Sequence, residues 1–136
     1  MIKKLTQLQN ELKAPKNQYN SFGKYNYRSA EDILEGVKPL LKKHNLGMTI
    51  SDEVKVIGDR YYVEATVTLY DFDSDKTIES KALAREEETK KGMDGAQVTG
   101  SSSSYARKYA LNGMFAIDDT KDSDFTNTHG KEVKQQ

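Results

Sequence analysis

Positively charged and aromatic side chains are interleaved between Lys13 and Arg28, a mixture that suits binding of single-stranded nucleic acid. Cations neutralise the phosphates, and aromatic faces stack on any base without reading sequence. The alternative for any single ring is that it pins the segment to the core, since tyrosine is often partly buried. As a unit, we interpret the segment as a DNA-contacting loop. Its cations and rings are Lys13, Lys16, Lys24, Arg28, Tyr19, Phe22, Tyr25 and Tyr27.

The stretch from Ala96 to Phe115 forms two distinct faces when it is plotted as a helix. Its serine run does not resemble a linker, because tyrosine, alanine and basic residues follow at helical spacing. One face carries small side chains, namely Ala96, Thr99, Ser103, Ala106, Ala110 and Gly113. The other face carries Gln97, Ser101, Ser104 and Lys108, which could bind a run of phosphates. Two questions stay open at this point: whether this is only a solvated surface helix, and whether the small face packs on its own sheet or on another subunit.

The charge distribution favours a local positive surface, although the net charge of the 136-residue chain is zero. Residues 1–43 hold nine basic and four acidic groups, whereas residues 44–80 hold three and eight. Such segregation can produce a local positive electrostatic potential on a protein whose net charge is zero. A chance arrangement of solvated faces would look similar.

Several function classes lack their signatures in this sequence. There is no cysteine and no phosphate-binding G-x-x-x-x-G-K-[ST] loop, so thiolate metal sites and an ATP-driven motor are not expected. Neither a membrane span nor a signal peptide is visible. Acidic residues at 86–88 and 118–124 could in principle bind a divalent metal for a nuclease, but without a supporting histidine pattern we interpret them as solvated. We expect no cofactor and no enzymatic activity.

Periodicity predicts an α+β domain: N-terminal helices, then a three-stranded antiparallel meander packed against helices. A short helix follows Ile2 and ends before Pro15; a second begins after a Ser29 N-cap, with Pro39 expected to kink or split it. Strands then alternate about a Gly58-Asp59 hairpin and a turn at residues 73–75, each burying one face. The domain is expected over 1–118, with a polar, disordered tail over 119–136.

Two long motifs resemble the Erf family of phage single-strand annealing proteins. They are K-N-Q-Y-N-S-F-G-K-Y-N-Y-R-S-A-E-D-I-L and G-S-S-S-S-Y-A-R-K-Y-A-L-N-G-M-F-A-I-D-D, and the likeness runs from about residue 5 to 124. The resemblance implies a β-β-β-α core, ATP-independent binding and annealing of single-stranded DNA in phage recombination, and rings or helical filaments of identical subunits. It also implies location in the bacterial host cytoplasm and a host single-strand-binding protein as a candidate partner.

Combining the resemblance with the residues, we assign ten positions to DNA contact. Those expected to contact backbone and bases are Lys24, Tyr25, Tyr27, Arg28, Arg107 and Lys108, with Lys90, Lys91, Tyr105 and Tyr109 as further candidates. The alternatives are a non-catalytic module that binds another protein and, less favoured, a metal-dependent nuclease.

Overall fold

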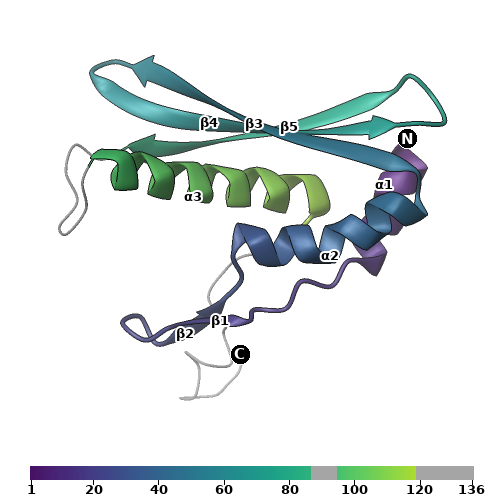
Figure 1. Cartoon of the computed structure of the whole chain (residues 1–136), viewed down its shortest axis with the longest axis horizontal. Coiled ribbons are helices and arrows are strands. Elements are labelled where there is room, and N and C mark those ends of the chain that lie inside the picture. The colour runs from purple at the N-terminus through teal and green to yellow at the C-terminus, as the bar shows by residue number, and fades with distance from the viewer. Residues whose placement is uncertain (87–94, 119–136) are drawn as a thin grey trace.

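The computed structural model describes residues 1–86 and 95–118, with only the backbone described for 95–100 (Figure 1). The predicted tail over 119–136 lies outside the described residues. The elements in chain order are α1 (Ile2–Glu11), β1 (Gln18–Asn20), β2 (Tyr25–Tyr27), α2 (Ala30–Lys43), β3 (Leu46–Ile57), β4 (Arg60–Asp71), β5 (Thr77–Glu86) and α3 (Gly95–Phe115). The predicted α+β fold with a three-stranded antiparallel sheet is confirmed.

The three long strands form a meander in the order β3-β4-β5, with the helices on one side of the sheet (Figure 1). Ile57 pairs with Arg60 across the predicted two-residue hairpin, where Gly58 has a φ of 65°. That left-handed conformation is one that glycine adopts without a steric penalty. Leu69, on the central strand, pairs with Met48 on one side and Ile78 on the other.

The small face of α3 packs on the protein's own sheet. Ala106 and Ala110 are fully buried. The hydroxyl of Ser80 on β5 donates a hydrogen bond of 2.9 Å to the Ala110 carbonyl oxygen. A Cβ added at Gly113 would lie 3.0 Å from that same hydroxyl, so the helix and strand approach closely. Small side chains therefore allow the long helix to lie against the alternating apolar residues of β4, which are Val63, Ala65, Val67 and Leu69.

The N-terminal helices complete the core beside α3. Ser29 and Asp32 form the capping box that starts α2, since each side chain accepts a hydrogen bond from the other's backbone N–H. Leu8 of α1 and Ile33 of α2 are fully buried. The Gln9 side chain donates a 2.9 Å hydrogen bond to the carbonyl oxygen of Met114, which ties α1 to the end of α3.

Two local predictions from the sequence are wrong, and a third is wrong in part. The segment predicted as a loop contains a two-stranded antiparallel hairpin, β1–β2. Of the two outcomes predicted for Pro39, a split of the second helix does not occur, because α2 runs through this exposed residue. Val54 and Val56 share the helix-facing side of β3 with Met48, yet they are 57% and 61% exposed. The distal half of β3 therefore does not bury its helix-facing side, although Val63 and Ala65 opposite it on β4 are buried.

Candidate nucleic-acid interface

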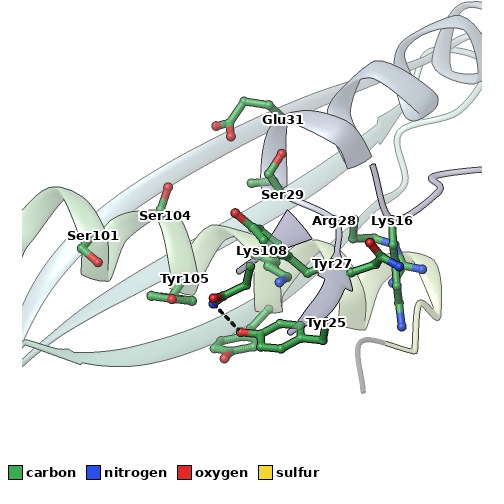
Figure 2. Close-up of a pocket in the computed structure, with 14 residues that line it drawn as sticks. Lys16, Tyr25, Tyr27, Arg28, Ser29, Glu31, Ser101, Ser104, Tyr105 and Lys108 are labelled. Atoms are coloured by element: carbon green, nitrogen blue, oxygen red, sulfur yellow. Dashed lines mark hydrogen bonds between the residues drawn. The ribbon is translucent and has the colours of Figure 1, made fainter. Parts of the chain in front are cut away.

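A pocket of about 470 Å³ lies where the β1–β2 hairpin, the start of α2 and one face of α3 meet (Figure 2). This volume is within the usual range of about 300–1,000 Å³ for small-ligand sites. Its two walls come from segments about eighty residues apart in the sequence. The lining residues are Lys16, Asn20, Tyr25, Asn26, Tyr27, Arg28, Ser29, Ala30, Glu31, Ser101, Ser104, Tyr105, Lys108 and Tyr109.

Two pairs of tyrosines give the pocket aromatic surfaces. Tyr105 and Tyr109, one turn apart on α3, are stacked with ring centroids 6.2 Å apart and an interplanar angle of 21°, and each is about half exposed. Tyr25 and Tyr27 on β2 are tilted at 59° with centroids 6.1 Å apart. The rings on α3 therefore support each other while leaving face area that a planar ligand could cover.

The charge that lines the pocket is mainly positive. Lys16, Arg28 and Lys108 contribute three cations, against one carboxylate from Glu31. The Lys108 ammonium lies 5.5 Å from the centroid of the Tyr27 ring, a cation–π contact between the helix and the hairpin. Figure 2 shows Lys108 of α3 beside Tyr27 of the hairpin, with Ser101 and Ser104 further along the same helix. The pocket thus combines cationic, aromatic and hydroxyl groups on one surface.

A structured turn joins β1 to β2 and sets the position of the aromatic strand. The Asn20 side-chain oxygen accepts a 2.9 Å hydrogen bond from the Gly23 backbone N–H, and its amide donates to the Tyr25 hydroxyl at 3.1 Å. A Cβ at Gly23 would lie only 2.3 Å from the Tyr25 ring, so any other residue there would have to displace that ring. Lys24 has a φ of 55° in this turn and is exposed, but it does not line the pocket.

Arg28 lies at the pocket but also braces the fold. Its Nε donates a 2.7 Å hydrogen bond to the Ala14 carbonyl oxygen, and its Nη1 donates a 2.8 Å bond to that of Asp118. These bonds tie together the segment after α1, the end of the hairpin and the segment after α3. We therefore assign Arg28 a structural role beside its place in the lining.

Arg107 lies on a different side of α3 from Lys108, and the expectation that both reach the same surface is not met. Its Nε donates to both carboxylate oxygens of Asp52 on β3, at 3.1 and 3.2 Å, and Ser103 donates a further hydrogen bond to that carboxylate. Partial burial raises the pKa of Asp52, but these hydrogen bonds outweigh it and the pKa lies below its usual value. Asp52, which interrupts the apolar row of β3, therefore anchors α3 to the sheet edge.

The structure thus brings six of the ten predicted DNA-contacting residues together: Tyr25, Tyr27, Arg28, Tyr105, Lys108 and Tyr109. Ser101 and Ser104 also face the pocket, as the polar row predicts. Lys90 and Lys91 lie outside the described residues, as does the side chain of Gln97.

The sequence analysis did not identify three further polar residues of the pocket, namely Asn20, Asn26 and Glu31. For Asn20, the signal that could have found it is strand pairing. In a hairpin closed by residues 21–24, Asn20 lies opposite Tyr25, and Gln18 lies opposite Tyr27.

Among the described residues, no group of three or more histidine, aspartate or glutamate side chains is placed to hold a metal ion. Most of the acidic residues weighed for a nuclease site lie outside the described ranges. No helix in the described part of the chain is both long and apolar enough to cross a membrane.

Comparison with known proteins gives a family match along the whole chain. The ERF superfamily model matches residues 1–136. The chain is 65% identical over 121 residues to a protein of Salmonella phage P22 named "Essential recombination function protein". The alignment covers 89% of this chain and 57% of that relative, so the chain spans little more than half the relative's length. No solved structure matches the chain.

Proposed function

The chain belongs to the ERF superfamily, and from this premise we propose that it binds single-stranded DNA without sequence preference and anneals complementary strands during phage recombination. The proposal includes action without ATP and without catalysis, in the cytoplasm of the bacterial host. It also includes assembly into rings or helical filaments, with a host single-strand-binding protein as a candidate partner.

The observation that carries the proposal is the convergence of stacked tyrosines and a lysine in one pocket. Tyr105 and Tyr109 present half-exposed rings, and Lys108 lies beside them over Tyr27. Base–aromatic stacking stabilises binding by about 1–3 kcal/mol per base and tolerates every sequence, because every base has a π-face. Lysine supplies a point charge for phosphate without reading base edges.

Annealing needs no energy source beyond base pairing in this arrangement. DNA stacking and pairing release about 1.4 kcal/mol per base-pair step, so complementary strands that are held close and partly neutralised pair spontaneously. The hydroxyls of Ser101 and Ser104 extend the phosphate-binding row along α3 from Lys108. The protein would hold bases by their faces and leave their pairing edges available.

Fluorescence anisotropy with labelled oligonucleotides of several sequences tests this proposal. We expect similar affinities for all single strands, falling with salt with a log–log slope of about −0.7 per phosphate neutralised. Tyr105→Ala with Tyr109→Ala should weaken binding at least about 5-fold, since one lost stacked base costs about 1 kcal/mol or more. The same variant should slow ATP-free annealing of two labelled complementary strands.

Tyr70→Ala is the matched control. Tyr70 is 38% exposed, and its hydroxyl hydrogen-bonds with Thr49. It follows the buried Leu69 on β4, so its side chain points to the sheet face away from the helices. Wild-type binding by the double tyrosine variant, or a loss of binding shared by the control, would contradict the proposal. Absence of oligonucleotide binding at low salt would favour a protein-interaction module, and strand cleavage in magnesium would favour a nuclease.

A further inference from the structure

Phe22 occupies the turn at the end of the β1–β2 hairpin with its side chain 99% exposed. The hairpin lies beneath the helices, on the side away from the three-stranded sheet (Figure 1). A phenylalanine so fully exposed contributes no packing to the fold. The sequence-based alternative, that this ring pins the segment to the core, is therefore wrong.

Specific contacts hold the backbone of the turn that carries Phe22. Asn20 accepts the hydrogen bond from the Gly23 N–H, and Gly23 lies so close to the Tyr25 ring that a Cβ would be only 2.3 Å from it. Lys24 adopts the left-handed conformation that returns the chain to β2. These constraints fix the backbone on both sides of Phe22, so the ring projects from a defined point of the turn.

The same hairpin supplies one wall of the pocket. Asn20 and Tyr25, the last and first residues of the two strands, both line the pocket, and they are the residues that flank the turn. A strand lying in the pocket would therefore pass close to the turn. Lys24, two residues after Phe22 in the same turn, is exposed and adds a cation to that end of the hairpin.

We infer that Phe22 inserts between neighbouring bases of the single strand at the hairpin end of the pocket, which keeps those bases unstacked from each other. This inference rests on the proposed function. Apolar side chains are known to act as such wedges between base steps. Unstacked bases held in an extended strand are accessible to a complementary strand, so the wedge would favour pairing.

The surroundings of Phe22 favour a base over a second protein surface as its partner. Its neighbours in the turn, Ser21, Gly23 and Lys24, carry no apolar side chain, although Tyr19 on β1 is also 53% exposed. A stable protein interface buries about 800 Å² on each partner. A single ring surrounded by polar groups is too small for that, whereas its size suits one base step.

The test uses the full chain with Phe22→Ala and Phe22→Trp. We expect Phe22→Ala to leave the thermal unfolding midpoint unchanged and to weaken single-strand binding about 5-fold or more. The loss should disappear on an oligonucleotide of abasic sites, which offers phosphates without bases. Because the chain contains no tryptophan, Phe22→Trp introduces a unique fluorophore, whose emission should be quenched when bases stack on it.

Phe72 provides the matched control. It is 67% exposed in the turn between β4 and β5. That turn is at the opposite end of the molecule from the β1–β2 hairpin (Figure 1). Phe72→Trp should show no quenching by single-stranded DNA, and Phe72→Ala should bind DNA as the wild type does.

Each outcome separates this inference from the proposed function. Suppose that Phe22→Ala binds normally and that the emission of Phe22→Trp does not change with DNA, while the Tyr105 and Tyr109 double variant still loses binding. Insertion of Phe22 between bases is then refuted, and the proposed binding of DNA in the pocket is retained. If the wild type does not bind single strands at all, the proposed function fails and the wedge fails with it. If Phe22→Ala alters the size of the protein assembly without DNA, Phe22 contacts a second copy and the inference is overturned.

Discussion

Arg107 and Lys108 are adjacent basic residues, but the structure predicts that alanine substitutions at the two positions have different effects. Arg107 is bonded to Asp52 on β3, whereas Lys108 lines the pocket and lies over Tyr27. The helical rotation of about 100° between consecutive residues separates their directions. Arg107→Ala should therefore act mainly on stability, and Lys108→Ala mainly on DNA binding.

The stability effect of Arg107→Ala can be sized from the exposure of its ion pair. The Arg107 and Asp52 side chains are 42% and 26% exposed, so solvent screens their attraction. Partly exposed pairs of this kind contribute about 0.2–1 kcal/mol. For a domain of this size that corresponds to a drop of about 1–5 °C in the unfolding midpoint. Single-strand affinity should stay within about 2-fold of wild type.

Lys108→Ala removes one pocket cation and its contact with the Tyr27 ring. If that cation neutralises one phosphate, the log–log slope of affinity against salt should become shallower by about 0.7. Lys108→Arg should preserve most of the binding, because arginine keeps both the charge and the cation–π contact. The unfolding midpoint should change little in either variant.

The assay is anisotropy at four or more salt concentrations, paired with thermal unfolding by circular dichroism for each variant. The reasoning is refuted if Arg107→Ala loses affinity and changes the salt slope while Lys108→Ala binds normally. It is also refuted if both variants lose binding equally at unchanged stability, because the two side chains would then share one DNA surface despite the Asp52 contact.

Two further predictions concern the scaffold. Gly36→Ala should lower stability by about 1–3 kcal/mol in urea unfolding, because its Cβ would lie 2.6 Å from the Lys13 carbonyl oxygen; a gain of about 1 kcal/mol, usual for glycine to alanine in a helix, would contradict this contact. The hydrogen bond from Lys4, then those from the Asp73 backbone and Ser74, lower the pKa of Asp71 well below its usual value. Because the folded pKa is depressed, this stabilisation is present above about pH 4 and is lost as pH falls toward the folded pKa. Asp71→Asn should therefore unfold at lower urea than wild type at pH 7, with a difference that shrinks in acid; a difference independent of pH would count against it.

Much of the sheet could be predicted because its pattern is local. Two-residue alternation along β4 and the Gly58-Asp59 signal determine which residues face the helices and where the chain reverses. The Ser29 cap is equally local, since the residues that it bonds lie within one turn. In each case the physical cause lies within a few residues of the signal.

The predictions that failed depend on contacts distant in sequence. Val54 and Val56 alternate correctly but are exposed, because α3 packs mainly against β4 and β5 rather than against β3. Alternation reports which side of a strand a residue faces, but it does not report how far a covering helix reaches. Pro39 is tolerated for a related reason, since it faces solvent on α2.

The pocket residues also could not be predicted fully from the sequence, because their roles depend on contacts distant in sequence. Residue type identified the cations and rings of both segments, but it could not divide them between DNA and scaffold. Asp52 on β3 decides the partner of Arg107, and the carbonyl oxygens of Ala14 and Asp118 decide that of Arg28. Lys108 is directed into the pocket, where its ammonium lies over Tyr27. The DNA surface that we propose is therefore set by where the fold directs each charge, and the composition of the two segments does not determine it.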